Sequence, residues 1–490
     1  MSAEERQPDS QDPSVSRRRF LALGAVPLAG LVHVEDALAS PPPTVYDVTT
    51  YGAQGDGTTD DANGIQAAVD AANARGGGTI VFPAGTFRVT RGITIYSNIV
   101  FRGAGSGVTR IKKSNGGGRY PILRSPGYDP PGTGVEISNW SLQNITLDGN
   151  KAGGALGHGL QAYGYGFSLF NVSIANCAER GLWSEYWTSP QNDEPLEAMV
   201  VNVRVHGCAQ GGIYWNGPHD SQWVNIVVYR CGPAGDTGST TKAVEVRSHA
   251  AGLRIANCHV WGTNHAYGWY LDCTGMDVSN CTGEGAEQAQ VVVLGNDCQL
   301  VGGKFWAARN GNQTAGIQIG VAGVNPAPAA TFVMTKVINC ELGALVFEND
   351  NGLGRYLLSV WQPAGDVVVA RSGGQIRGSN RFDLQVSGGA DVGDLGGLKP
   401  ITLHEDVLST GGIEVDGDVR AGSQTSKLSF FGAPLQTRSG GWSIGYVPDV
   451  RRLDGSADLN QVRAVLATLL RELRRYGLLA ATPHTPSTKP

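Results

Sequence analysis

Five short segments of the chain carry polar and aromatic residues at matching positions. The segments 159–163, 181–185, 212–216, 243–247 and 268–272 each have an apolar or small residue at the second and fourth positions. Because side chains alternate along a β-strand, the third and fifth positions are expected to face solvent and to stack about 4.8 Å apart in successive strands. The third positions form a first column, Gln161, Trp183, Tyr214, Glu245 and Tyr270, and the fifth positions form a second column, Tyr163, Glu185, Asn216, Arg247 and Asp272.

This mixture of side chains predicts an oligosaccharide-binding groove. Aromatic faces stack on sugar rings, while carboxylates, amides and a guanidinium bind hydroxyl and uronate groups. Large aromatic residues on exposed positions would otherwise reduce solubility, which favours a groove over ordinary surface side chains that only stiffen a sheet. The residues expected to bind the sugar are Tyr163, Trp183, Glu185, Asn216 and Tyr270.

Two types of reaction are compatible with the groups in and beside these columns. Elimination or epimerisation of a uronate requires one group that neutralises the carboxylate, one that removes the C5 proton and one that supplies a proton. Arg247, His219 and Tyr214 could take these three roles. Hydrolysis instead requires two carboxyl groups, and Glu245 and Asp272 are expected about 8 Å apart, which is within the range of inverting hydrolases.

Calcium is a candidate cofactor, although the carboxylates that could bind it are dispersed. A Ca²⁺ site needs several oxygen ligands gathered at one point. Glu185, Glu245 and Asp272 stand in three different segments. The sequence therefore predicts no defined metal site, and calcium binding stays open.

Repeated short strands are expected to position the two columns. From Ile93 to about Phe347, alternating strands are broken by Gly and Asn and recur at a little over twenty residues, which corresponds to one coil of a β-helix. The preceding block, 45–89, predicts a strand, a helix that Thr59 or Asp60 caps, and two further strands. One face of this helix is apolar, formed by Ile65, Ala68, Val69 and Ala72.

The block 45–89, with YGAQGDGTTDD at 51–61, resembles the N-terminal cap of the pectate-lyase-like superfamily. That superfamily includes polygalacturonases, rhamnogalacturonases, epimerases and phage tailspikes. The resemblance implies an all-β fold, a single-stranded right-handed parallel β-helix or solenoid. In this family an N-terminal capping helix covers the open end of the first coil, where apolar core and strand edges would otherwise be exposed.

The segment 214–220 resembles the catalytic segment of mannuronan C5-epimerases. Tyr214, Pro218 and His219 match that motif, whereas Gly217 stands where the family has an aspartate. The predicted function is a polysaccharide lyase that acts on a uronate-containing polysaccharide. The alternatives are a glycoside hydrolase that uses Glu245 and Asp272, a C5-epimerase, and a non-catalytic, trimeric carbohydrate-binding or tailspike-like protein.

The C-terminal part has a different pattern. Residues 351–440 predict a β-rich extension that either continues the solenoid or forms a small β domain, and residues 441–490 predict an amphipathic helical tail with a disordered end. The segment 427–433 and the tail resemble a module of phage tail proteins. The apolar seam of the tail helix could form a homotrimer or dock on the solenoid's own end, and it consists of Leu459, Val462, Leu466, Leu469, Leu473 and Tyr476.

Charge and the N-terminus limit the partners and the location. The 490 residues have a formal net charge of -5, so no basic surface favours nucleic acid, and a polysaccharide or oligosaccharide is the expected partner. Residues 1–39 contain three arginines at 17–19, an apolar run and a final Ala-Leu-Ala, an order typical of a twin-arginine export signal. No later run reaches the length of a membrane span, so residues 40–350 are expected to form a secreted β-helix.

Cysteines recur at strand ends. Seven of the eight follow a short alternating stretch and precede a turn-rich segment, which suggests one recurring position in the coil. Buried free thiols behave as small apolar groups, so free cysteines are expected in preference to disulfides.

Overall fold

The computed structural model describes residues 44–126, 135–186, 196–233, 240–307, 314–321, 330–340, 342–348, 354–362, 366–371, 381–388, 427–428 and 436–437. The chain divides into two units, Met1–His404 and Glu405–Pro490. In the second unit the described residues form β36 (Lys427–Leu428) and β37 (Gln436–Thr437), which pair antiparallel. The predicted export signal and the predicted C-terminal helix lie outside the described residues.

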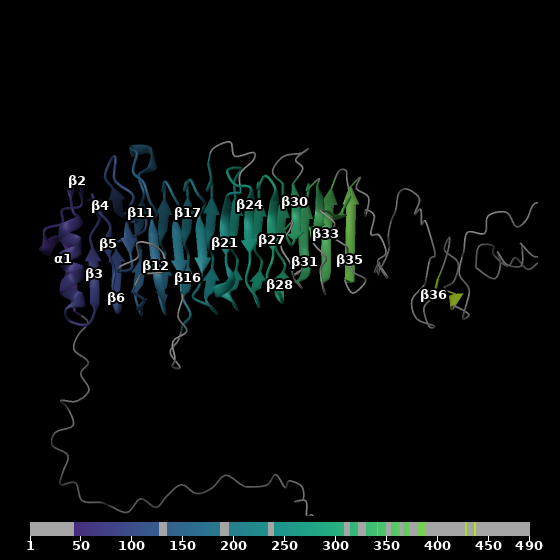
Figure 1. Cartoon of the computed structure of the whole chain (residues 1–490), viewed down its shortest axis with the longest axis horizontal. Helices are drawn as coiled ribbons and strands as arrows, with labels where there is room; N and C mark the ends of the chain where they lie inside the picture. The colour runs from purple at the N-terminus through teal and green to yellow at the C-terminus, as the bar shows by residue number, and fades with distance from the viewer. Residues whose placement is uncertain are drawn as a thin grey trace, which may run out of the picture. The chain divides into compact units, whose positions relative to one another are not determined.

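A short cap opens the first unit, and its helix lies at the purple end of the row of strands in Figure 1. The predicted apolar face of the helix is confirmed, because Ile65, Ala68, Val69 and Ala72 are fully buried. The cap consists of β1 (Val45–Asp47), η1 (Val48–Tyr51), β2 (Asp56–Asp60), α1 (Ala62–Asn73), β3 (Gly78–Phe82) and β4 (Gly85–Val89).

The start of α1 partly follows the prediction. Asp60 Oδ1 accepts a hydrogen bond from the N–H of Ala62 at 3.2 Å, which satisfies one of the free amides at the helix start. Thr59 lies in β2, and its hydroxyl donates to Asp56 Oδ2 at 2.8 Å. Its predicted capping role is therefore wrong, because the strand continues to Asp60.

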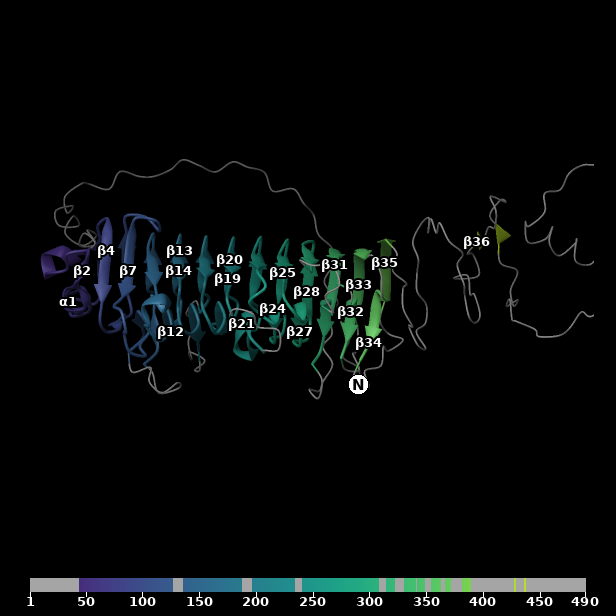
Figure 2. The same cartoon turned by 90° about the horizontal axis from the view of Figure 1, so that it is seen from above.

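Parallel strands of successive coils stack into two long sheets, which Figure 2 shows along the same row. The predicted right-handed parallel β-helix is confirmed. The 12-stranded sheet consists of β5 (Ile93–Thr94), β8 (Leu123–Arg124), β9 (Ile137–Ser138), β12 (Leu160–Tyr165), β15 (Leu182–Glu185), β18 (Ile213–Asn216), β21 (Lys242–Val246), β24 (Tyr267–Leu271), β27 (Ala289–Val293), β30 (Ala315–Ile319), β32 (Gly343–Phe347) and β34 (Val368–Ala370).

The 23-stranded sheet has two rows of strands in each coil. The first row consists of β1, β3, β6 (Ile99–Gly103), β10 (Ser141–Gln143), β13 (Ser168–Phe170), β16 (Met199–Val201), β19 (Gln222–Val224), β22 (Arg254–Ala256), β25 (Asp277–Ser279) and β28 (Cys298–Val301). The second row consists of β2, β4, β7 (Thr109–Lys113), β11 (Thr146–Asp148), β14 (Ser173–Ala175), β17 (Arg204–His206), β20 (Val227–Tyr229), β23 (His259–Trp261), β26 (Thr282–Glu284) and β29 (Lys304–Trp306).

The last coils join the two rows. β31 (Ala330–Ile338) pairs with both β28 and β29, and β33 (Arg355–Gln362) and β35 (Arg381–Gly388) follow in parallel. These strands and β34 continue the solenoid beyond residue 350, the first of the two arrangements that the sequence allowed. No helix in the described part of the chain is long and apolar enough to cross a membrane.

Asparagines turn the corner between the two rows. Their left-handed backbone suits a residue whose short polar side chain bonds locally. Asn171 Nδ2 donates to Asn144 Oδ1 at 2.8 Å, and Asn225 Nδ2 donates to Asn202 Oδ1 at 2.6 Å. The ladder, whose φ angles lie between 51° and 56°, consists of Asn144, Asn171, Asn202, Asn225, Asn257 and Asn280.

All eight cysteines are free and buried, as predicted. They do not share one position, which corrects the sequence interpretation. Cys177, Cys208 and Cys231 follow strands of the second row, whereas Cys258 and Cys281 follow strands of the first. What these cysteines share is a preceding residue with left-handed backbone. Such residues occur after strands of the first row and after strands of the second row.

Candidate active site

The first column lies on the 12-stranded sheet in the predicted register. Each of its residues is the parallel partner of the next, in the order Gln161, Trp183, Tyr214, Glu245 and Tyr270. The residues between them point inward, and Trp215, Val246 and Leu271 are almost completely buried. The alternation of the five segments therefore predicted the outward positions correctly.

The second column follows the same coils. Tyr163 partners Glu185, and Glu185 partners Asn216. The amides of Arg247 and Asp272 continue the ladder, since they donate to the carbonyls of Trp215 at 2.8 Å and of Val246 at 2.9 Å.

Half of the column residues are less exposed than predicted. Gln161, Tyr163, Glu185, Asn216 and Glu245 are each at most 8% exposed, although they point away from the core. Side chains that stack at the spacing of adjacent strands cover one another. The columns therefore form the floor of a groove instead of a solvated face.

The aromatic faces of the first column are occupied by neighbouring side chains. The rings of Trp183 and Tyr214 stack with centroids 4.2 Å apart and planes 27° apart. The Arg180 guanidinium lies 5.3 Å from the Tyr214 centroid. These residues consequently present mainly their edges and polar atoms to a ligand, and the predicted stacking of sugars on their faces would have to displace a neighbour.

Glu245 is the centre of a charge cluster. Its Oε2 lies 2.5 Å from Arg180, and its Oε1 lies 2.9 Å from Lys242 and 3.7 Å from Arg247. Burial opposes ionisation, but Arg180, Lys242 and Arg247 outweigh it and hold the pKa of Glu245 below its usual value. Glu245 is therefore a fixed anion, and it is poorly suited to act as a general acid.

Arg247 also pairs with the second predicted hydrolytic carboxylate, Asp272. Its Nη1 lies 3.2 Å from Asp272 Oδ2 as well as 3.7 Å from Glu245 Oε1. Burial raises the pKa of Asp272, while Arg247 and Lys242 oppose this shift. One guanidinium thus bridges the two groups between which a hydrolase would hold its glycosidic bond.

Tyr214 and Tyr270 are both protonated at neutral pH. Burial raises the pKa of Tyr214; the nearby Glu185 adds to the shift, and Arg247 opposes it. Burial raises the pKa of Tyr270 to about 12. The Lys242 ammonium lies 4.1 Å above the Tyr270 ring, so this face too is occupied.

His219 lies apart from the charge cluster. Its Nδ1 is 2.6 Å from Asp220 Oδ2, and its ring meets that of Tyr186 edge-on at 5.9 Å. Within the described residues, no hydrogen bond or ring contact joins His219 to Tyr214 or Arg247. The structure therefore gathers Tyr214, Glu245, Arg247 and Asp272 but places His219 beyond the end of β18.

Gly217 has a backbone conformation that a residue with a side chain adopts only with strain. Its φ is +107°, and an added Cβ would lie 2.9 Å from Tyr186 Cβ. The carboxylate that mannuronan C5-epimerases carry here has no counterpart at this position. Asn216, the preceding residue, contacts His249, with 3.4 Å between Nδ2 and Nδ1.

Sequence reasoning missed Arg180, Lys242 and His249. Arg180 and Lys242 each immediately precede an aligned segment, 181–185 or 243–247. A basic residue at that repeated position is a signal that could have identified them. His249 follows the second column and carried no comparable signal.

Two hollows lie over the first column. One of about 660 Å³ is lined by Arg180, Trp183, Tyr214, Lys242 and Glu245, among others. The second, of about 280 Å³, lies over earlier coils and is lined by Arg124, Gln161 and Trp183, among others. Among the described residues, no group of three or more His, Cys, Asp or Glu side chains could hold a metal ion, so the calcium prediction gains no site.

Known proteins resemble parts of this chain in sequence and in fold. Residues 45–287 match the family model described as rhamnogalacturonase A/epimerase, pectate lyase-like. Mannuronan C5-epimerase AlgE5 of Azotobacter vinelandii is 44% identical over 207 residues, which cover 37% of this chain and 20% of that protein. Alginate lyase 7 of the same organism is 39% identical over 115 residues, which cover 22% of this chain and 13% of that protein.

The chain thus spans a fifth or less of the length of these two relatives. The solved A-module of mannuronan C-5 epimerase AlgE4 from Azotobacter vinelandii matches 73% of this chain and 100% of its own, with a TM-score of 0.56 and 19% identity. That likeness establishes the fold. Residues 45–287, about half of the chain, are therefore similar in sequence to the rhamnogalacturonase A/epimerase, pectate lyase-like family, and the fold agrees with this similarity.

Proposed function

We propose that this protein is a polysaccharide-active enzyme that cleaves a uronate-containing polysaccharide by β-elimination. The observation that carries the proposal is the cluster beside Tyr214, in which Arg180, Lys242 and Arg247 surround the buried Glu245. These three cations exceed the charge of Glu245 and Asp272, and Arg247 remains 37% exposed. A substrate carboxylate would find positive charge next to a protonated phenol.

In this proposal Arg247 neutralises the uronate carboxylate, which acidifies the C5 proton. The base is His219, which lies beyond the end of β18 and apart from the cluster, so the bound sugar must extend from Arg247 toward it. Asp220 at 2.6 Å can accept the Nδ1–H of His219 and leave Nε2 to take the proton. The electron pair forms the C4–C5 double bond as the bond from C4 to the glycosidic oxygen breaks. Tyr214, which is protonated at neutral pH, donates its proton to the leaving oxygen.

C5-epimerisation is the second candidate, and the similarity to AlgE5 over 207 residues favours it. It shares the first proton transfer, after which a proton returns to the opposite face of C5. Hydrolysis receives less support, because Arg247 bridges Glu245 and Asp272 and the pKa of Glu245 is lowered.

The test is to incubate the full chain with a panel of uronate polymers and neutral glycans. Ultraviolet absorbance detects unsaturated uronates, a reducing-end assay detects all cleavage, and NMR detects epimers. We expect absorbance with uronate polymers and a loss of about 100-fold or more in kcat for Tyr214→Phe. Tyr229→Phe, on the other sheet, is the matched control and should retain activity.

Other outcomes would replace the proposal. Altered epimer content without cleavage would establish the epimerase, and reducing ends without absorbance would establish hydrolysis. Binding with no reaction of any substrate would favour the carbohydrate-binding alternative.

A further inference from the structure

We propose that Arg124 forms a distal carboxylate-binding subsite, about three sugar units from Tyr214 on the N-terminal side of the groove. This inference rests on the proposed function. It adds the side of Tyr214 on which the bound uronate chain extends and the minimum length of that chain.

Arg124 lies on the same outward column as the candidate active site. It is the parallel partner of Gln161, which leads through Trp183 to Tyr214. Three strand spacings place Arg124 about 14 Å from Tyr214 along the solenoid. A 1,4-linked pyranose advances a chain by close to one strand spacing, so this interval corresponds to about three sugars.

Arg124 differs from the other cations of the groove in its partners. Its half-buried guanidinium makes no hydrogen bond or ion pair with any described residue. By contrast, Arg119 binds Glu179, and the cluster cations bind Glu245 or Asp272. A half-buried guanidinium without an anion is well suited to a bidentate contact with a ligand carboxylate.

The hollow around Arg124 has both charged and flat surfaces. Its volume is about 280 Å³, and His158, Gln161, Glu179 and Trp183 line it beside Arg124. His158 Nδ1 accepts the N–H of Arg180 at 3.1 Å, and its Nε2 lies 3.1 Å from Glu179 Oε2. These contacts fix the wall that this hollow shares with the Tyr214 site.

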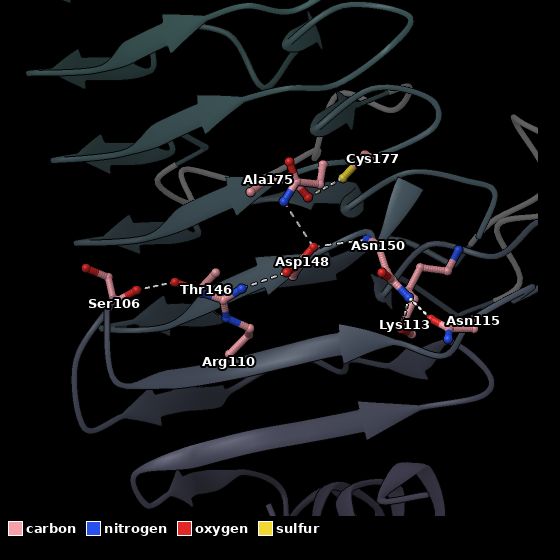
Figure 3. Close-up of polar contacts among 10 residues, drawn as sticks. Ser106, Arg110, Lys113, Asn115, Thr146, Asp148, Asn150, Ala175 and Cys177 are labelled. Atoms are coloured by element: carbon pink, nitrogen blue, oxygen red, sulfur yellow. Dashed lines mark hydrogen bonds and ion pairs between the residues drawn. The ribbon is translucent and has the colours of Figure 1, made fainter. Parts of the chain in front are cut away.

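A buried lysine holds the opposite rim in place. The Lys113 ammonium donates to the carbonyls of Gly118, at 3.3 Å, and of Tyr120 and Leu156. Asn150 Nδ2 donates to the carbonyl of Lys113 at 3.0 Å and to Asn115 Oδ1 at 2.8 Å (Figure 3). The rim that carries Arg119 and Tyr120 is thus organised before a ligand arrives, which lowers the cost of binding.

The C-terminal direction of the column is closed. Beyond Tyr270 the outward partners are Val292, Gln318 and Val346. Val292 and Val346 are 0% exposed and belong to an apolar cluster that includes Leu294. A polymer bound at Tyr214 therefore has its accessible floor on the Arg124 side.

The test measures binding of uronate oligosaccharides of two to six units by calorimetry, with turnover suppressed by Tyr214→Phe. Adding Arg124→Gln should raise the Kd about tenfold for oligosaccharides of four or more units, because one charged hydrogen-bonding contact contributes about that much to affinity. The Kd for dimers should stay unchanged. Arg102→Gln, an exposed arginine on the 23-stranded sheet, is the control and should change neither.

Equal losses at every length, or no loss with six units, would overturn the subsite. The melting temperature of Arg124→Gln should equal that of the parent, because no described residue depends on its guanidinium. Failure of the proposed function is a separate result, since an unmodified chain that turns over no uronate polymer can still show the length-dependent loss.

Discussion

At the scale of single residues, Glu245 shows how burial and charge compete. Its side chain is 8% exposed, which alone would favour the neutral acid, yet Arg180, Lys242 and Arg247 keep it ionised. Removing one partner of such a buried cluster leaves the remaining charges without compensation. The carboxylate is therefore expected to support the structure of the site as well as its charge.

Glu245→Gln should lower the free energy of unfolding by about 3 kcal/mol at pH 7, because three cations lose their anion. The folded pKa lies below the ordinary 4.5, so this contribution is complete above pH 4.5 and is lost as the pH falls through the folded pKa. Calorimetric melting of both proteins across this range is the measurement.

Glu284→Gln is the matched control for that prediction. Glu284 lies on the other sheet, and its ion-pair partner is His259, whose Nε2 is 3.9 Å from Glu284 Oε1. Because this pair is long, little change in stability is expected. An equal loss in both variants, or a loss for Glu245→Gln that persists in acid, would contradict the role given to the cluster.

At the scale of elements, the corner between the two rows depends on left-handed residues. Asparagine fills this corner in six successive coils, followed by Gly302 and then Met334. Met334 has a φ of 52° and is 76% exposed, so its side chain gains little packing to offset the unfavourable backbone.

Met334→Asn is therefore expected to stabilise the solenoid by about 1 kcal/mol, since asparagine adopts this conformation more readily. The measurement is the midpoint of denaturant unfolding. Met199→Asn, an exposed methionine in β16 with ordinary strand geometry, should not stabilise. Equal effects at the two positions would show that loss of exposed apolar surface, and not backbone conformation, is responsible.

At the scale of the whole molecule, we propose that residues 1–39 direct export by the twin-arginine pathway. Eight buried free thiols fit a protein that completes its fold before it meets an oxidising compartment. The homotrimer also stays a prediction, since its helix lies outside the described residues.

Replacing all three arginines at 17–19 by lysine should abolish export, because the pathway recognises the arginine pair. Fractionation of expressing cells would measure this, with the unmodified chain as the control. Unchanged export of the lysine variant would point to another route.

Sequence alone determined the repeat and the outward columns. Alternation in 159–163, 181–185 and 212–216 fixes which side chains leave the core, because a strand has a period of two residues. Stacking of successive coils then brings the matching positions of these segments into register. Tyr214, Glu245, Arg247 and Asp272 could be found together for this reason.

Only the tertiary structure decided which groups surround these residues and how deeply they lie. Arg180 precedes β15 and Lys242 is the first residue of β21, so both lie outside the aligned segments, and packing turns both toward Glu245. The pattern likewise left His219 free to join Tyr214, whereas the turn after β18 directs it to Asp220. Burial and charge–charge distances depend on contacts between coils, which no local pattern records.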